Sequence, residues 1–210
     1  GLGDVYKRQV GRDLSKLTLG IAGTGAIGSS VAQMGAAMGM KVLAYDLNLR
    51  QELMSSIKVE YVDFSEFLSR SDVISIHMPY TGNNHHMFSD EEFNMMKDNS
   101  YFVNTSRGEI VDTNAAYNAM VSGKLAGLAL DVVACEDLTF RCVKHVEKLK
   151  DFSLECVREV ELIKKLVKLN NVIITPHIAY KTQDAIDYIL EQTFDGIRDC
   201  IKGGRKYRVY

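Results

Sequence analysis

Short apolar runs alternate along the chain with longer stretches whose apolar residues recur every three or four positions. The runs are typical of buried strands, and the longer stretches have the period of helices with one apolar face. The expected strands are 17–22, 41–45, 59–62, 72–78, 101–104, 125–133, 172–175 and 206–210. The expected helices are 26–37, 47–56, 65–70, 89–97, 114–122, two within 136–170, and 182–202. This alternation predicts an α/β fold, a doubly wound parallel sheet with helices on both faces.

Local signals set two of the expected helix ends. Ser65 is a suitable cap for the helix over 65–70, because its hydroxyl can accept a hydrogen bond from a free helical N–H group. Gly123 should close the helix over 114–122, because glycine adopts the left-handed conformation that commonly ends a helix.

Three glycines follow the first expected strand with the spacing G-x-G-x-x-G: Gly23, Gly25 and Gly28. We expect Gly23 to permit a tight turn, Gly25 to let the backbone approach a pyrophosphate, and Gly28 to allow close packing of helix on strand. The helix start offers free N–H groups to phosphates. Asp46, about 20 residues further on, would accept hydrogen bonds from a ribose diol and repel the 2′-phosphate of NADP. A glycine-rich turn in another α/β domain is the alternative, but this order of strand, glycines, helix and acid favours a dinucleotide.

Further polar residues follow or close other expected strands, at the edge where an open α/β sheet binds ligands. Arg107 could hold a carboxylate with two parallel hydrogen bonds. His177 could exchange a proton near neutral pH, and Glu136 could pair with its imidazolium. Taken singly, a surface arginine, a structural histidine and a first-turn helix acid are the ordinary explanations. Their shared position beside a dinucleotide site favours a chemical role.

The composition is that of an ordinary globular protein, with 210 residues, 46% of them hydrophobic and 25% charged. The net charge of -2 gives no electrostatic case for binding nucleic acid or an anionic membrane. No apolar run is long enough to span a bilayer. The cysteines, Cys135, Cys142, Cys156 and Cys200, form no C-x-x-C pair, so we expect reduced thiols in a cytoplasmic protein.

Four ordered motifs resemble those of the D-2-hydroxyacid dehydrogenases. They are H-M-P-Y-T at 77–81, N-T-S-R-G at 104–108, L-D-V-V-A-C-E at 130–136 and N-N-V-I-I-T-P-H at 170–177. The resemblance extends from residue 13 to about residue 202. G-M-K-V-L-A-Y-D at 39–46 and P-H-I-A-Y-K-T at 176–182 look closest to the D-lactate dehydrogenase branch. The resemblance implies a Rossmann-type NAD-binding domain and hydride transfer between NAD(H) and a small 2-keto or D-2-hydroxy acid.

The resemblance also implies a role for each matching residue. Arg107 would bind the substrate carboxylate and help to polarise the keto oxygen, and His177 would be the acid/base on that oxygen. Glu136 would keep His177 protonated, and Asp131 would help to place the nicotinamide end. No metal site is implied, and the implied cofactor-binding residues are Gly23, Gly25, Ala26, Ile27, Gly28, Asp46, His77, Pro79, Thr105, Ser106, Arg107, Asp131 and His177.

The sequence departs from the family pattern in two places. Val133 and Ala134 stand where the family often has an aromatic and an acidic or other residue. No segment as long as the first part of the family's substrate domain precedes Leu17, and the chain begins with Gly rather than Met.

The second departure leads us to expect an unstructured or truncated lead-in over 1–12 and an NAD-binding domain over 13–180. Over 181–210 we expect a C-terminal helix that returns toward an absent substrate domain. Such a piece should bind NADH without reducing a keto acid. Its full-length parent is expected to be a homodimer.

Three other functions compete with the dehydrogenase. A corepressor-like regulator that binds NAD without turnover is the main alternative; the presence of Arg107, Glu136 and His177 together favours the enzyme. A short-chain dehydrogenase would need a tyrosine with a lysine four residues on, which none of the ten tyrosines has. For a metalloenzyme, the neighbours His85 and His86 would face opposite ways on a strand and make a poor pair of ligands. The resemblance puts His86 near the cleft without assigning it a role.

Overall fold

The computed structural model describes residues 11–140 and 153–204. It divides into two compact units, Gly1–Pro176 and His177–Tyr210, and each is described by itself. The strands are β1 (Thr18–Ala22), β2 (Lys41–Tyr45), β3 (Glu60–Tyr61), β4 (Val73–Ile76), β5 (Ser100–Asn104), β6 (Leu125–Leu130) and β7 (Val172–Ile174). The helices are α2 (Ala26–Ala37), α3 (Gln51–Ser56), α4 (Phe64–Arg70), α5 (Asp90–Met95), α6 (Thr113–Val121), α7 (Glu136–Phe140), α8 (Leu154–Leu166) and α9 (Gln183–Ile201), with 3-10 turns η1 (Leu14–Lys16) and η2 (Gly108–Ile110). The strand expected over 206–210 lies outside the described residues.

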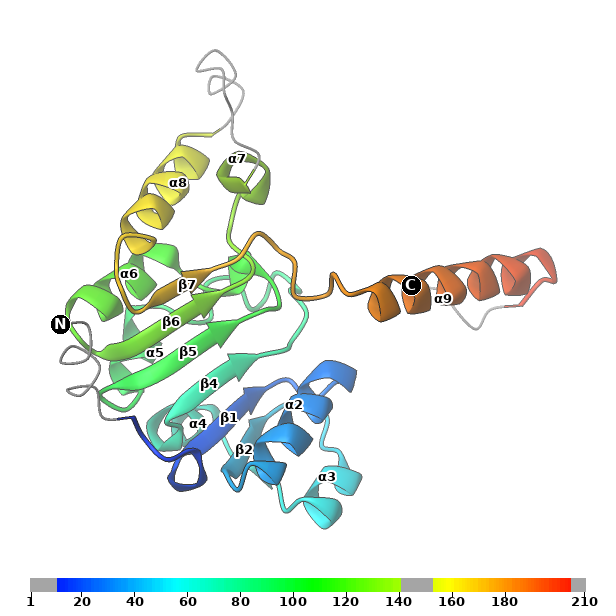
Figure 1. The fold of residues 1–210 in the computed structure, drawn as a ribbon, viewed down its shortest axis with the longest axis horizontal. Coiled ribbons are helices and arrows are strands. Elements are labelled where there is room, and N and C mark those ends of the chain that lie inside the picture. The colour runs from blue at the N-terminus through cyan, green and yellow to red at the C-terminus, as the bar shows by residue number, and fades with distance from the viewer. Residues whose placement is uncertain (1–10, 141–152, 205–210) are drawn as a thin grey trace, which may run out of the picture. The chain divides into compact units, whose positions relative to one another are not determined.

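In the first unit the strands form one parallel sheet in the order β3-β2-β1-β4-β5-β6-β7 (Figure 1). The chain builds outward from β1 to β3 and then returns, so that β4 pairs with the other side of β1. In an open sheet, the crevice beside such a reversal is where ligands bind. The doubly wound α/β fold predicted from the sequence is therefore confirmed.

Two apolar cores lie on opposite faces of the sheet, because successive residues of a strand point to opposite sides. Ile21 belongs to one core and its neighbour Ala22 to the other. The larger core joins residues of α4, α5, α6 and α8, and includes the fully buried rings of Phe67, Phe93 and Phe102. The smaller core packs α2 and α3 on β1 and β2. Helices thus cover both faces, as expected.

Helix α2 meets the sheet through its smallest residues. Gly28, Ala32 and Gly35 are its buried residues, whereas Ile27 and Met34 are 69% and 54% exposed. A Cβ atom on Gly35 would lie 2.4 Å from a methyl carbon of the Leu19 side chain, so a larger residue would push the helix outward. Ile27 and Met34 therefore follow the helical spacing of apolar residues but do not contribute to the core.

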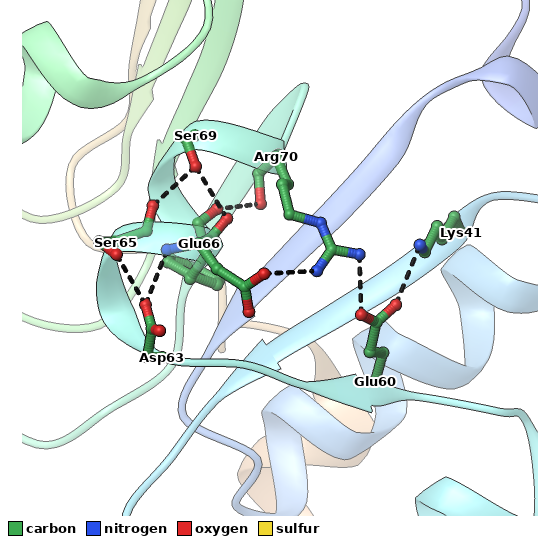
Figure 2. Close-up of polar contacts among 9 residues, drawn as sticks. Lys41, Glu60, Asp63, Ser65, Glu66, Ser69 and Arg70 are labelled. Atoms are coloured by element: carbon green, nitrogen blue, oxygen red, sulfur yellow. Dashed lines mark hydrogen bonds and ion pairs between the residues drawn. The ribbon is translucent and has the colours of Figure 1, made fainter.

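The cap of α4 corrects the sequence expectation, because Asp63 rather than Ser65 occupies that position (Figure 2). The Asp63 carboxylate accepts a hydrogen bond of 2.8 Å from the third amide of the helix and another from the Ser65 hydroxyl. At the other end of α4, Arg70 pairs with Glu60 of β3 at 2.8 Å, and Glu60 also pairs with Lys41 of β2 at 2.9 Å. Hydrogen bonds from both cations lower the pKa of Glu60.

Two other expected elements end or begin elsewhere. The strand expected over 125–133 stops at Leu130, so Asp131 follows β6 rather than lying within it. The helix expected over 47–56 begins only at Gln51, with extended backbone at the residue before it. Both differences leave a longer loop at the carboxyl edge of the sheet, which is the edge that carries the predicted site.

A buried carboxylate ties the chain together at the start of β4. Asp72 accepts hydrogen bonds from the backbone N–H of Thr18 at 2.9 Å, from Arg12 at 3.0 Å and from Lys97 at 3.1 Å. Burial alone would raise the pKa of Asp72, but the bonds from Thr18, Lys97 and Arg12 outweigh it and lower the pKa overall. Asp72 is therefore a charged structural link between β1, β4 and the segment after α5.

The expectation of reduced thiols is wrong for two cysteines. Cys135 and Cys156 form a disulfide, with Cα atoms 5.6 Å apart and a sequence separation of 21. The fold brings the residue before α7 to the first turn of α8, which no local spacing could reveal. Cys200 is free and exposed, as expected, and Cys142 lies outside the described residues.

The second unit is built on α9, whose first turn is capped by Thr182 through a 3.2 Å hydrogen bond from the amide of Ala185. An apolar stripe runs along α9 and has no buried member; its residues Ile189, Leu190 and Phe194 are 50%, 50% and 60% exposed. Across 11–140 and 153–204, no helix combines the length and apolar character needed to cross a membrane.

Candidate functional site

The glycine turn after β1 has the geometry that its sequence predicts. Gly23 has a φ of +93°, and a Cβ atom there would lie 2.8 Å from the backbone nitrogen of Met78. A Cβ atom on Gly28 would lie 1.9 Å from the carbonyl oxygen of Gly23, so only glycine lets α2 start this close to β1. Gly25 has open space around it. The approach of a pyrophosphate at Gly25 stays a prediction.

Asp46, at the end of β2, is joined to the glycine turn by Thr24. One carboxylate oxygen accepts hydrogen bonds of 2.5 Å and 2.9 Å from the amide and hydroxyl of Thr24, and the other accepts 2.8 Å from the amide of Asn48. Burial raises the pKa of Asp46, but the bonds from Asn48, Thr24 and the amide of Leu47 lower it overall. Asp46 is therefore an anion at neutral pH, held at the mouth of the turn.

Sequence reasoning missed Thr24 and its second partner. Thr24 is fully buried, and its hydroxyl also accepts a 3.0 Å hydrogen bond from Tyr61 of β3. The same Tyr61 hydroxyl accepts a hydrogen bond of 3.1 Å from the amide of Arg50. A polar residue between two glycines of the turn was the only available signal for this network, because the contact depends on β1, β2 and β3 lying side by side.

A cavity of about 530 Å³ opens at the carboxyl ends of β1, β2 and β4. Its size is in the range of small-molecule sites. Five of the predicted cofactor residues line it: Gly23, Gly25, Asp46, His77 and Pro79. Other residues line it as well, among them Thr24, Asn48, Met78, Asn84 and Met87. The cavity thus lies at the topological reversal and carries an anion on one wall and methionines on another.

The H-M-P-Y-T motif forms the wall that follows β4. Burial lowers the pKa of His77, so this imidazole is neutral near pH 7, and its Nε2 lies 2.9 Å from the Ser75 hydroxyl. The side chain of Asn84 fixes the following loop by donating to the carbonyl of Pro79 at 2.9 Å and accepting from the amide of Thr81 at 2.9 Å.

The N-T-S-R-G motif is a loop held by its own first residue. The buried side chain of Asn104 donates to the carbonyl of Arg107 at 2.8 Å and accepts from the amide of Ser106 at 2.9 Å. The Ser106 hydroxyl donates to the carbonyl of Met78, which joins this loop to the wall of the cavity. Arg107 is exposed, and its guanidinium donates at 2.7 Å to the carbonyl of Ser106.

The loops after β5, β6 and β7 are packed on one another. A Cβ atom on Gly108 would lie 2.1 Å from the carbonyl carbon of Val133, so the loop of Arg107 and the segment before α7 touch backbone to backbone. Asp131 is buried, and its amide donates a hydrogen bond of 2.9 Å to the carbonyl of Asn104. Its carboxylate accepts a hydrogen bond of 2.5 Å from the Thr175 hydroxyl. The carboxyl ends of three strands therefore form one hydrogen-bonded edge.

The remaining predicted residues divide between the two units. Glu136 is the first residue of α7 and half-buried, in the first unit. His177 begins the second unit, with a φ of +52° and its ring 5.9 Å, centre to centre, from the ring of Tyr180. The pairing of His177 with Glu136 and its approach to Arg107 stay predictions.

The expectation for His85 and His86 is wrong in its geometry. They lie in a turn rather than a strand, and their rings stack at 3.9 Å between centres instead of facing opposite ways. His86 has a φ of +50°, a left-handed conformation that does not occur in a strand. Among the described residues, no group of three or more His, Cys, Asp or Glu side chains could hold a metal ion.

This chain matches a known protein family over most of its length. The model described as "D-isomer specific 2-hydroxyacid dehydrogenase, NAD binding domain" matches residues 3–179. The chain belongs to this family. The cofactor predicted from the glycine turn is therefore the one for which this domain of the family is named.

Relatives in the D-isomer specific 2-hydroxyacid dehydrogenase family differ in what they are named for. A D-specific alpha-keto acid dehydrogenase from Enterococcus faecium is 36% identical over 196 residues, which are 93% of this chain and 55% of that protein. A glyoxylate reductase from Thermococcus litoralis is 36% identical over 194 residues, 92% of this chain and 52% of that protein. The chain thus spans about half the length of the curated relatives it matches.

A solved family structure gives the same fold. The D-lactate dehydrogenase from Aquifex aeolicus, complexed with NAD and lactic acid, superposes with a TM-score of 0.83 at 40% sequence identity, over 96% of this chain and 60% of that one. The resemblance to the D-lactate dehydrogenase branch inferred from the motifs is in line with this match.

Proposed function

We propose that this chain is the NAD-binding part of an enzyme that reduces a small 2-keto acid to a D-2-hydroxy acid and catalyses the reverse oxidation. The observation that carries the proposal is the contact of Gly108 with Val133, which presses the loop of Arg107 against the segment that leads into Glu136. The same loop is bonded to the cavity wall through Ser106 and Met78. This contact supports the proposal because it brings the loop of Arg107 and the segment before Glu136 together, next to a wall of the cavity.

The residues present fit a dinucleotide. The open space at Gly25 admits a phosphate next to backbone N–H groups at the start of α2, where the helix dipole favours an anion. The ionised carboxylate of Asp46 faces the cavity and can accept from the two hydroxyls of a ribose. When bound, NADH supplies the hydride, and the protein supplies orientation and charge.

The protein's own residues would then bind and protonate the substrate. The exposed guanidinium of Arg107 has the planar fork that holds a carboxylate in two parallel hydrogen bonds. His177 would give a proton to the keto oxygen as hydride reaches the adjacent carbon, and take it back in the reverse reaction. Glu136 would hydrogen-bond to His177 and favour its protonated form. A positioned acid of this kind contributes about 10²- to 10⁴-fold to a rate.

The proposal extends to the substrate's side chain, the assembly and the compartment. The relatives are named for alpha-keto acids, glyoxylate and D-lactate, so the shared part is the 2-keto acid group and the rest varies. We propose a homodimer of the complete enzyme and a cytoplasmic location. A regulator that binds NAD without turnover is the competing function, and the presence of Arg107, Glu136 and His177 together supports the enzyme instead.

The test compares His177→Asn with the parent sequence in a complete enzyme that contains this chain. NADH oxidation by pyruvate and glyoxylate should fall by about 10²-fold or more, while the affinity for NADH stays nearly unchanged. Asparagine keeps the size and a hydrogen-bonding group but cannot transfer the proton. Equal turnover in both proteins would reject His177 as the acid, and no turnover in the parent with intact NADH binding would favour the regulator.

A further inference from the structure

We propose that Cys135 and Cys156 form a reversible, redox-sensitive crosslink that holds the start of α7, and with it Glu136, against the first turn of α8. The two sulfur atoms are bonded, and the Cα atoms lie 5.6 Å apart. Because the sequence separation of the cysteines is 21, the fold rather than a local motif creates the pair. The consequence for catalysis rests on the function proposed above, in which Glu136 orients His177.

Cys135 is the residue on which α7 is built. Its carbonyl oxygen accepts hydrogen bonds from the amides of Leu138 at 3.0 Å and Thr139 at 3.1 Å, and from the Thr139 hydroxyl at 3.2 Å. Its φ of +55° lies in the left-handed region, which residues with a side chain adopt only where their surroundings hold them. A bond that fixes Cys135 therefore also fixes the first turn of α7, whose first residue is Glu136.

The other end of the crosslink is anchored in the core. Cys156 lies in the first turn of α8, and its amide donates at 3.2 Å to the Ser153 hydroxyl that caps the helix. Further along α8, Ile163 and Leu166 are buried in the larger core, and α8 packs on both α6 and α7. Oxidation thus attaches the segment of Glu136 to a helix that the core already holds.

Both redox states are expected to be folded, which is what a switch requires. Leu138 of α7 is buried at 5% exposure, and Ile163 and Leu166 hold α8 in the larger core at positions away from Cys156, so we expect both helices to stay packed when the bond opens. Reduction should therefore loosen the start of α7 locally rather than unfold the unit. The half-burial of both cysteines leaves room for a small thiol or disulfide reagent to reach them.

The exchange reaction balances with a low-molecular-weight disulfide such as glutathione disulfide as oxidant. The thiolate of Cys156 attacks one sulfur of the oxidant, forms a mixed disulfide and releases one thiolate. The thiolate of Cys135 then attacks the Cys156 sulfur and releases the second thiolate. Two electrons pass from the protein to the oxidant, and the two protein protons end on the two released thiols. Excess glutathione reverses both steps.

The first test counts thiols in the chain that carries Cys142→Ser and Cys200→Ser, so that only the proposed pair remains. The protein is equilibrated with stepped ratios of glutathione to glutathione disulfide, quenched in acid and alkylated with a maleimide of high mass. We expect one reversible step from two labelled thiols to none. Two labelled thiols in pure glutathione disulfide, a stable mixed disulfide, or a crosslinked dimer would overturn the proposal.

The second test measures hydrogen exchange by mass spectrometry in both redox states. The amides of Leu138 and Thr139 should exchange more slowly in the oxidised chain than in the reduced chain, by a factor of roughly ten or more. The amides of α2 should exchange at the same rate in both states, which reports that both are folded. Cys156→Ser, which leaves the residue beside Glu136 untouched, should show the reduced behaviour at every ratio. Equal exchange of Leu138 and Thr139 in the two states would overturn the proposal.

A titration with NADH in both states separates this proposal from the proposed function. The cavity at the ends of β1, β2 and β4 has neither cysteine in its lining, so the NADH affinity should be the same whether the pair is oxidised or reduced. Failure to bind NADH in either state would reject the proposed function and leave the thiol count and the exchange result intact. In a complete enzyme, a turnover that is identical in both states would reject the link to Glu136.

Discussion

Replacing Gly108 by alanine should separate the two loops on which the proposed site depends. The added Cβ atom would lie 2.1 Å from the carbonyl carbon of Val133, and 2.4 Å from its oxygen and from the nitrogen of Ala134. Ordinary contact begins at 3.4 Å, so the loops must move apart by about 1.3 Å. The atoms in the way are backbone, which cannot rotate aside as the end of a side chain could.

Forced overpacking of this kind lowers the free energy of unfolding by about 1–3 kcal/mol. A loss of about 2 kcal/mol lowers the melting temperature of a chain of this length by roughly 4–8 °C. Circular dichroism melting of Gly108→Ala measures the change, with Gly11→Ala as the matched control because nothing lies within 4 Å of a Cβ atom there. In a complete enzyme, a displacement near 1 Å should also cost about 10²-fold in turnover. If Gly108→Ala and Gly11→Ala have the same melting temperature, the two loops are not packed as tightly as the structure shows.

Three further predictions concern charged groups. Asp46→Asn should weaken binding of NADH and strengthen binding of NADPH, because the anion that would repel a 2′-phosphate is gone; an unchanged ratio of the two dissociation constants would contradict this role. Asp72→Asn should destabilise the chain at pH 7 but not at low pH. The pKa of Asp72 is lowered in the folded state, so the stability that the ionised carboxylate contributes is complete above the unfolded value of about 3.9 and is lost as the pH falls through the lower folded value. Denaturant midpoints of both proteins across this pH range check the prediction. A difference between the two midpoints that persists at the acid end would refute it. In a complete enzyme, Glu136→Gln removes the charge that favours protonated His177, so reduction should fail at a lower pH than in the parent; identical pH profiles would argue against the pair.

The order of elements and the glycine turn could be predicted because both depend on local rules. Buried strands appear as short apolar runs, and the spacing of Gly23 and Gly28 reflects contacts within one strand–turn–helix unit. The end of β2 at Tyr45, directly before Asp46, was equally local, since the apolar run stops there.

What the sequence did not reveal depends on contacts between distant segments. Thr24 meets Asp46 only because β1 and β2 are neighbours, and Cys135 meets Cys156 only because α7 packs on α8. The cap of α4 was misplaced for a different reason, since Asp63 and Ser65 are both good caps and the choice between them is made by the extended backbone at Asp63. Motifs therefore predicted candidate residues for the site, and only the fold showed which distant side chains contact them.

The most direct test of the account is a titration of the purified chain with NADH. Because the chain has no tryptophan, the change in NADH emission can be followed without overlapping indole fluorescence. We expect saturable binding of NADH that Asp46→Asn weakens. A folded chain that shows no saturable binding would contradict the assignment of the cavity between Gly23 and Asp46 to the cofactor.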